Sequence, residues 1–226
     1  MDNGFYGFAG KANRSDFSVK TILESRIIAI TRGVYGDDLL SAVQAVYDGG
    51  IRAVEVTFEQ NGDLLRTSRA VEKLCERFGG RMTIGAGTVL TEEQVRIAYN
   101  SGAQYIVSPN TDKTVIGMTK GLGMGSIPGA MTPTEITAAA SFGADIVKVF
   151  PAGALGAEYF KAVTVPLRHI RCAAVAGVTL KNIADFKSAG ACAFGISSSI
   201  LNNKLIAEHR FSDIMKTATA YCNAAK

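Results

Sequence analysis

Short apolar runs alternate with longer amphipathic stretches along most of the chain. Eight of these runs are rich in β-branched and small apolar residues and are bounded by glycine, proline or polar residues, which is typical of buried strands. Consecutive runs start roughly 20–30 residues apart, as repeated strand–helix–strand units require. The predicted strands are residues 26–30, 53–58, 82–87, 105–109, 125–129, 146–151, 172–177 and 192–197.

The stretches between the predicted strands carry helix boundary signals. Thr91 is followed by two glutamates, which predicts an N-cap and an acidic first turn. Thr132 is a second predicted N-cap, with Pro133 at the first helical position. A further helix is expected within residues 15–24, before the first strand. The alternation of strands and helices favours an α/β fold with a parallel sheet.

Eight strand–helix units in a chain of this length fit a (β/α)8 TIM barrel. The alternative is an open doubly wound sheet, which normally carries a G-x-G-x-x-G turn after its first strand. Residues 31–36 read TRGVYG instead. We therefore predict a single-domain barrel formed by residues 26–226, preceded by an N-terminal segment and helix at residues 1–25.

The composition supports one sizeable core and narrows the range of partners. The chain has 226 residues, 47% of them hydrophobic, and its net charge of +4 comes from 24 basic and 20 acidic residues that are interspersed. This pattern predicts a small anionic substrate and argues against nucleic-acid or membrane binding. The start of the chain lacks the apolar region of a signal peptide, and no apolar run approaches the ~20 residues of a membrane span. A cytoplasmic location is therefore expected, and the scattered cysteines predict neither disulfides nor a metal site.

Lys148 interrupts an otherwise apolar predicted strand. Val147 and Val149 share the face that suits packing against helices, so the alternation of side chains directs Lys148 into the barrel. The same argument directs Glu55, on the second predicted strand, into the barrel. Glu55 lies on the second predicted strand and Lys148 on the sixth. Each layer of side chains inside a barrel comes from alternate strands, so two even-numbered strands can contribute to the same layer. Glu55 and Lys148 are therefore predicted to share a layer.

A buried lysine opposite a glutamate has a specific chemical use. Desolvation lowers the pKa of the amine, so that its neutral form can attack a carbonyl and form a Schiff base. The carboxylate can then move the protons that bond cleavage requires. The pair predicts an imine-forming lyase, although the pattern alone leaves a purely structural ion pair open, because buried charges need partners.

Five ordered motifs carry a resemblance to a known family. They are GGIRAVEVTF (49–58), GAGTVL (85–90), IVSPN (106–110), IPGAMTPTE (127–135) and VKVFPA (147–152). From about residue 27 to residue 201, the chain resembles the bacterial 2-keto-3-deoxy-6-phosphogluconate and 4-hydroxy-2-oxoglutarate aldolases, which are class I aldolases. The resemblance implies reversible cleavage of a 2-keto-3-deoxy sugar acid to pyruvate and an aldehyde. It also implies a homotrimer that uses no metal or other cofactor.

The resemblance assigns roles to individual residues. Lys148 is similar to the family's Schiff-base lysine, and Glu55 matches its general acid/base glutamate. Thr88, Pro109 and Phe150 match residues that line the pyruvate pocket. These assignments agree with the placement of Lys148 and Glu55 that the strand alternation predicts.

The chain departs from the family pattern where the substrate carboxylate should bind. The family motif E-V-T-x-R ends in an arginine that binds this carboxylate, and the matching position here is Glu59. An acidic side chain cannot hold a carboxylate in this way. We assign that role to Arg32, which follows the first strand and lies at the same end of the barrel.

The second departure concerns the substrate phosphate. Barrels often bind phosphate through backbone amides in the loops after strands 7 and 8. The family's T-G-G turn after strand 7 is Val175-Ala176-Gly177 here, and its G-S after strand 8 is Ser197-Ser198. We expect Ala176, Gly177, Ser197 and Ser198 to form the phosphate site, with the extra methyl group of Ala176 narrowing it.

Two other functions remain compatible with the sequence. A phosphosugar isomerase or epimerase on the same barrel would use Lys148 to stabilise an enediolate and Glu55 to move a proton. The reversed charge at Glu59 also leaves open a non-catalytic paralogue that binds an acidic metabolite.

Overall fold

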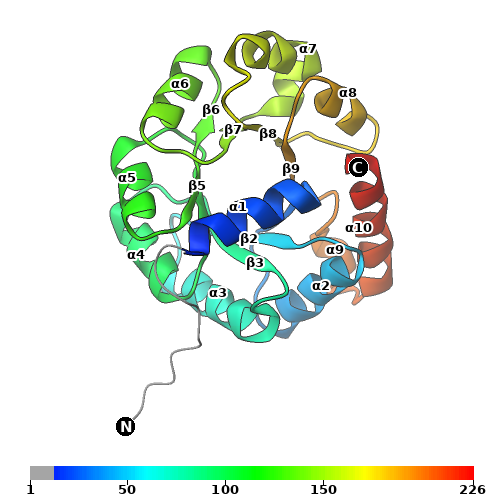
Figure 1. Ribbon diagram of the computed structural model, residues 1–226. Coiled ribbons are helices and arrows are strands. Elements are labelled where there is room, and N and C mark those ends of the chain that lie inside the picture. The colour runs from blue at the N-terminus through cyan, green and yellow to red at the C-terminus, as the bar shows by residue number, and fades with distance from the viewer. Residues whose placement is uncertain (1–12) are drawn as a thin grey trace.

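A computed structural model describes residues 13–226, in which parallel strands form a nearly closed barrel surrounded by helices (Figure 1). The prediction of a (β/α)8 barrel is confirmed, and the apolar runs identified in the sequence are the strands. The strands are β1 (Ile27–Thr31), β2 (Ala53–Thr57), β3 (Thr83–Gly87), β4 (Tyr105–Val107), β5 (Gly125–Ile127), β6 (Gly129–Ala130), β7 (Val147–Val149), β8 (Cys172–Val175) and β9 (Ala193–Ile196).

The described chain has nine strands rather than eight because the predicted fifth strand is interrupted. The sheet order is β5-β4-β3-β2-β1-β9-β8-β7-β6, and every neighbouring pair is parallel. Its two edge strands, β5 and β6, are separated along the chain only by Pro128, which has no N–H to give to a strand ladder. The two edges of the sheet thus belong to one interrupted strand, and β5 and β6 together count as one of the eight strands of the barrel.

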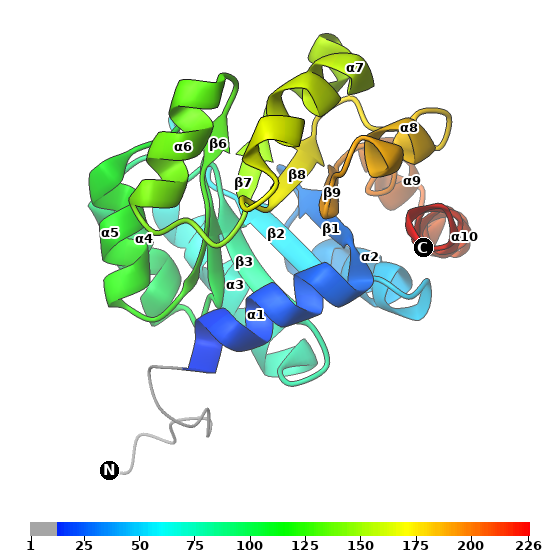
Figure 2. The ribbon, with the colours of Figure 1, turned by 45° about the horizontal axis from the view of Figure 1, so that its top comes forward.

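Helices connect the strands and form the outer layer (Figures 1 and 2). The predicted caps are present: Thr91 accepts a hydrogen bond from the N–H of Gln94 at 3.2 Å, and Thr132 forms a reciprocal capping box with Glu135. None of the helices that the structure describes has both the length and the apolar character needed to cross a bilayer. The helices are α1 (Asn13–Ser25), α2 (Gly36–Asp48), α3 (Leu64–Phe78), α4 (Glu92–Asn100), α5 (Lys113–Gly121), α6 (Pro133–Ser141), α7 (Ala152–Thr164), α8 (Ile183–Ser188), α9 (Asn203–Ala207) and α10 (Phe211–Ala225), with a 3-10 turn at Val165–Leu167.

Helix α1 covers the end of the barrel at which the strands begin. Figure 1 looks onto this end, and α1 crosses in front of the strands. Its Val19 and Ile22 are buried with the residues of the barrel interior, and Ser18 donates a hydrogen bond to the carbonyl of Gln104 at 3.2 Å. The predicted N-terminal helix is therefore observed, with slightly wider bounds, and residues 1–12 of the predicted N-terminal segment lie outside the described residues. With this end covered, the interior opens at the carboxyl ends of the strands.

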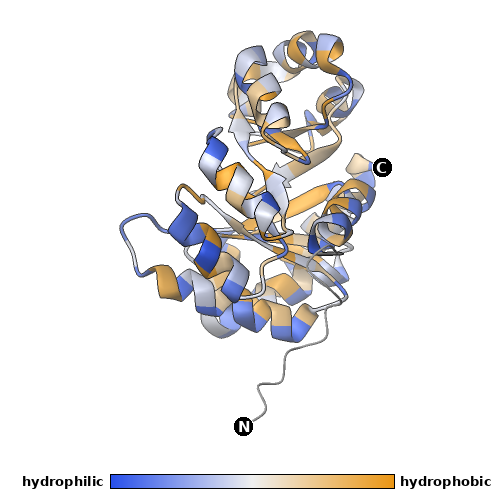
Figure 3. Cartoon of the chain, turned by 60° about the vertical axis from the view of Figure 1, so that its left-hand side comes forward, coloured by the Kyte–Doolittle hydropathy of each residue, from blue (hydrophilic) through white to orange (hydrophobic). Residues whose placement is uncertain are grey.

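The apolar core is divided by the sheet into two clusters. The outer cluster, between sheet and helices, contains Val54 and Val56 of β2 and Val147 and Val149 of β7. The inner cluster fills the barrel and contains Tyr105 among other residues of alternate strand positions. In Figure 3 the strands are mostly hydrophobic, whereas the hydrophilic colour gathers on the outward turns of the helices. This division confirms that the valines flanking Lys148 face the helices.

Candidate active site

Lys148 and Glu55 both lie inside the barrel, as their strand alternation predicts. Lys148 is the central residue of β7 and is 7% exposed, and Glu55 is the central residue of β2 and is 3% exposed. Both line one cavity of about 150 Å³ that lies at the carboxyl ends of the strands. The structure thus brings together two ionisable groups of opposite sign, drawn from strands on different sides of the barrel.

Two glycines of β3 create the space for this arrangement. Gly87 pairs with Thr57 in the parallel register, and a methyl group added to Gly87 would overlap the Glu55 carboxyl group. Gly85 pairs with Glu55 itself, and a methyl group there would overlap the ring of Tyr105. The GAG run of β3 is therefore required by its neighbours, because any larger residue would displace either the carboxylate or the tyrosine.

Burial shifts the ionisation of both groups towards their neutral forms. Burial raises the pKa of the Glu55 carboxyl above its ordinary 4.5, while the positive charges of Lys148 and Arg32 act in the opposite direction. Burial lowers the pKa of the Lys148 amine below its ordinary 10.5; Glu55 opposes this change, and Arg32 adds to it. Both residues are among those that the structure describes, and no nitrogen–oxygen contact of 4.0 Å or less joins them. The site therefore favours a nucleophilic amine that is not neutralised by a tight ion pair.

The cavity collects most of the site residues predicted from the sequence. The Nζ of Lys148 lies 4.8 Å from the centre of the Phe150 ring, two residues further along the chain. The predicted residues that line the cavity are Arg32, Glu55, Thr88, Lys148, Phe150, Ala176, Gly177, Ser197 and Ser198. Pro109 follows β4 at the same end of the barrel, but it lies outside the lining, where its carbonyl oxygen packs closely against Gly129.

Other lining residues were not anticipated. Most of them are apolar, and their ordinary hydrophobic character gave no signal in the sequence. Gly195 is an exception, because a glycine within a strand often marks a close approach. A methyl group added there would lie 2.9 Å from Val175 and 3.1 Å from Ile30. The lining residues that were missed are Ile30, Val178, Gly195, Ile196 and Ser199, and the cavity is also lined by Val175, which stands at the family's threonine position.

Thr88 reaches the cavity through an unusual backbone conformation. If β3 continued with regular alternation, the side chain of Thr88 would face the helices, as do those of Ile84 and Ala86 in the outer cluster. Thr88 instead follows the end of the strand with a φ of 55°, in the left-handed region that a β-branched residue rarely adopts. This turn brings Thr88 to the cavity lining, and such strain at a site residue is typical of functional positions.

Glu59, the residue with reversed charge, is engaged outside the cavity. Its carboxylate accepts a hydrogen bond from the hydroxyl of Tyr35 at 3.1 Å, and the guanidinium of Arg66 stacks 3.9 Å above the Tyr35 ring. Tyr35 belongs to the loop after β1 that also carries Arg32 into the cavity lining. Glu59 therefore tethers the loop of Arg32, and the cation near Lys148 and Glu55 comes from that loop.

The loop after β8 is built from two residues with left-handed backbone. Ala176 has a φ of 69° and Gly177 a φ of 77°. The carbonyl of Ala176 accepts a hydrogen bond from the N–H of Gly153 at 2.7 Å, and a methyl group added to Gly153 or to Gly177 would collide with the other glycine. The loop is thus held against the start of α7, and alanine occupies a conformation in which glycine is favoured.

We predict that Ala176→Gly stabilises the protein by about 0.5–1 kcal/mol. Relief of the left-handed alanine is worth about 1–2 kcal/mol, and the greater freedom of glycine in the unfolded chain returns about 0.4–1 kcal/mol of this. Urea unfolding should show a higher midpoint at an unchanged slope. Ala174→Gly is the matched control: Ala174 is buried in strand β8, outside the left-handed positions, so this change should destabilise the protein. A lower midpoint for Ala176→Gly would contradict the prediction.

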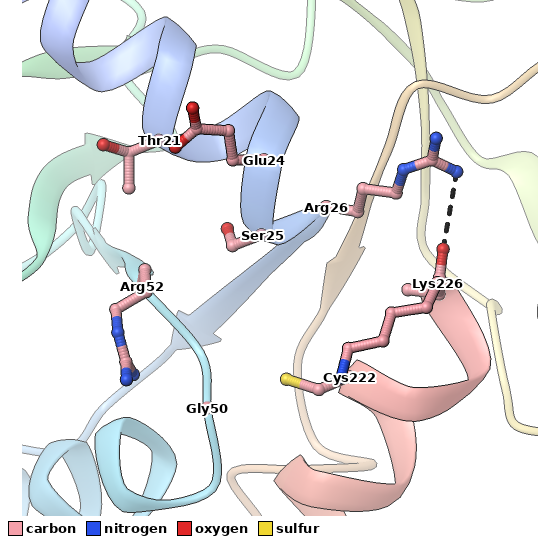
Figure 4. Close-up of a pocket in the computed structure, with 9 residues that line it drawn as sticks. Thr21, Glu24, Ser25, Arg26, Gly50, Arg52, Cys222 and Lys226 are labelled. Carbon is pink, nitrogen blue, oxygen red and sulfur yellow. Dashed lines mark hydrogen bonds between the residues drawn. The ribbon is translucent and has the colours of Figure 1, made fainter.

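A larger cavity, of about 470 Å³, lies where α1, the loop before β2 and α10 meet (Figure 4). Two of its cations, Arg26 and Arg52, are hydrogen-bonded to backbone carbonyls. Arg26 donates to the carbonyl of Ala225 at 3.4 Å, and Arg52 donates to the carbonyls of Tyr47 and Ile51 at 2.7 and 2.9 Å. Neither Lys148 nor Glu55 lines it, so the smaller cavity is the candidate active site.

Comparison with known proteins gives consistent matches. Residues 19–217 match the family model described as KDPG and KHG aldolase. The chain is 38% identical to 2-dehydro-3-deoxy-6-phosphogalactonate aldolase of Escherichia coli, over 77% of this chain and 83% of that protein. It is 35% identical to 2-dehydro-3-deoxy-phosphogluconate aldolase of Treponema pallidum, over 71% and 75%. The solved structure titled "Native KDPGal structure" superposes with a TM-score of 0.78 at 35% identity, over 88% of this chain and 93% of that one.

Proposed function

The chain belongs to the KDPG and KHG aldolase family and is a carbon–carbon lyase, and from this premise we propose that it works through a Schiff base on Lys148. The observation that carries the proposal is the burial of Lys148 opposite Glu55 in one cavity, with the amine pKa lowered by desolvation. A metabolite-binding paralogue or an isomerase has no comparable support, because the relatives are named as aldolases.

In the proposed reaction, the neutral Nζ of Lys148 attacks the C2 carbonyl of a 2-keto-3-deoxy sugar acid. Loss of water from the resulting carbinolamine gives an iminium ion. Glu55 then accepts the proton of the C4 hydroxyl, the C3–C4 bond breaks, and its electron pair moves into the iminium to form an enamine. The C4 fragment leaves as an aldehyde. Glu55 returns the proton to C3, and hydrolysis of the imine releases pyruvate and the free amine.

The remaining cavity residues are proposed to hold the two anionic ends of the substrate. Arg32 pairs with the C1 carboxylate, because it is the cation whose charge reaches both Glu55 and Lys148. Thr88 and Phe150 enclose the pyruvate half, and Pro109 supports that side from behind Gly129. A phosphate at C6 would bind the loops formed by residues 176–177 and 197–198.

We propose 2-dehydro-3-deoxy-6-phosphogalactonate as the preferred substrate. The Escherichia coli relative that is named for this substrate is 38% identical, and Val175 places an apolar side chain in the cavity where the resembled family has a threonine. The gluconate epimer and 4-hydroxy-2-oxoglutarate are the alternatives, the first supported by the name of the Treponema pallidum relative. These acids share the 2-keto group and the C4 hydroxyl on which the chemistry depends.

The proposal is tested with the purified protein, pyruvate and borohydride. We expect a single reduced pyruvate adduct per chain, located on Lys148 by peptide mapping. Steady-state cleavage should then give a higher kcat/KM for the galactonate than for the gluconate epimer. An adduct on another lysine, or no adduct, would refute the Schiff-base assignment. A preference for the gluconate epimer or for 4-hydroxy-2-oxoglutarate would refute only the choice of substrate.

The resemblance also supports a homotrimer acting in the cytoplasm, in the breakdown of sugar acids. Sedimentation equilibrium should give three times the chain mass of 23.8 kDa, and a monomer or dimer would contradict this part of the proposal.

A further inference from the structure

The barrel interior contains hydroxyl groups that have no hydrogen-bond partner. Among the described residues, the buried hydroxyls of Thr57, Thr83 and Tyr105 lack a partner, and all three residues lie on β2, β3 or β4. The side chain of Tyr105 is completely buried. Buried tyrosine hydroxyls nearly always find a partner in the protein or in ordered water, so an unpartnered one requires an explanation.

The strand register places the Tyr105 hydroxyl near Glu55. Gly85 is the register partner of Glu55 on one side and of Tyr105 on the other, so the three residues lie at one level of the barrel. A methyl group added to Gly85 would overlap the far edge of the Tyr105 ring, including the carbon that bears the hydroxyl. The ring therefore extends across Gly85 from β4 towards β2, where Glu55 is the residue at that level.

The groups around the Glu55 carboxylate are two cations and one neutral hydrogen-bond donor. Lys148 on β7 and Arg32 after β1 are the cations that act on its carboxylate, and Tyr105 on β4 is the neighbouring phenol. Burial raises the pKa of Tyr105 well above 10.0, and the charge of Glu55 raises it further, so the phenol keeps its proton and is a donor. A hydrogen bond to a carboxylate favours its ionised form.

We propose that Tyr105 is a positioning residue for Glu55: its hydroxyl donates, through one bridging water, to the carboxylate and holds it in the orientation that accepts the C4 proton. Within the described part of the chain, no direct hydrogen bond joins the two groups, and a bridging water can connect polar groups that do not meet directly. This inference rests on the proposed function of Glu55. It also gives a functional reason for the glycine at position 85, which leaves room for the phenol at the level of the carboxylate.

Tyr105→Phe tests the proposal, because it removes one oxygen atom and leaves the ring in place. We expect kcat to fall about 10-fold and the acidic limb of the kcat/KM profile to move up by about one pH unit, since the carboxylate loses a donor. The KM and the rate of pyruvate trapping should change less than about two-fold, because Lys148 and Arg32 remain in place. The midpoint of urea unfolding should fall only slightly, because the ring stays in place and only the water-mediated hydrogen bond to the carboxylate is lost.

Tyr221→Phe is the matched control, because Tyr221 is also buried but lies on α10 in the outer cluster. It should leave the pH profile unchanged. In a Glu55→Gln background, Tyr105→Phe should cause no further loss of kcat, because the two residues act as a unit. An unchanged pH profile in Tyr105→Phe, with wild-type protein that traps pyruvate on Lys148, would overturn this inference alone. A wild-type protein that forms no adduct would overturn the proposed function as well.

Discussion

Lys148→Met is expected to abolish pyruvate trapping and to lower kcat/KM by at least about 10⁴-fold, because the covalent intermediate can no longer form. Methionine approximates the length of the lysine stem and suits a position that is only 7% exposed, so the barrel should remain folded. Intact mass after borohydride reduction measures the adduct, and a coupled assay for pyruvate measures turnover. Far-ultraviolet circular dichroism and a urea midpoint would show that the variant is folded.

Lys161→Met provides the matched control for this loss. Lys161 is exposed on α7, the helix that follows β7, and its removal changes the net charge by the same amount. It should retain wild-type trapping and turnover. If Lys148→Met still formed an adduct at another lysine, the assignment of the nucleophile would be wrong. If it kept turnover without an adduct, neither the nucleophile nor the charge of Lys148 would be required for the reaction.

The position of Lys148 could be predicted from the sequence because few residues decide it. Val147 and Val149 must face the helices, and this forces the lysine between them into the barrel. The same rule places Glu55 between Val54 and Val56. For both residues, the sequence was sufficient to predict that the side chain points into the barrel, since alternation is a local property of a strand.

Other features depend on backbone geometry or on register, which the alternation does not contain. Thr88 enters the cavity lining through a left-handed turn that no pattern of apolar residues indicates. The level shared by Glu55, Gly85 and Tyr105 follows from the pairing of three strands, whose offsets the sequence does not state. The sequence did not explain the acidic residue at position 59. Its hydrogen bond from Tyr35 depends on the loops after β1 and β2 lying next to each other, which is a feature of the tertiary structure.

The fold also explains how the protein tolerates two buried charges. Replacing such a pair by apolar residues is often neutral or stabilising, so stability alone is a weak reason to retain it. Here glycine at position 87 leaves room for the Glu55 carboxylate and glycine at position 85 for the Tyr105 ring, and neither has a side chain that packs in the interior. Residues that forgo packing to leave room for a carboxylate and a phenol are consistent with a site maintained for chemistry rather than for core stability.

Glu55→Gln is expected to lower kcat by about 10²–10⁴-fold while the imine with pyruvate still forms. The amide cannot accept the C4 proton, but the nucleophile and its surroundings remain. The negative charge of Glu55 raises the pKa of Lys148, so its removal lowers that pKa further below 10.5. A larger fraction of the amine is then neutral at a given pH below that value, and the pH profile of pyruvate trapping should move towards acid relative to wild type.

The two variants should therefore separate the two chemical roles. Lys148→Met loses both trapping and turnover, whereas Glu55→Gln loses turnover and traps pyruvate at lower pH than the wild type. Glu158→Gln, at an exposed position on α7, removes the same charge away from the cavity and should change neither. If trapping by Glu55→Gln shifted towards alkaline pH, the carboxylate would not be the group that holds the lysine protonated. If trapping were lost as completely as in Lys148→Met, Glu55 would be required to form the imine and not only to break the carbon–carbon bond.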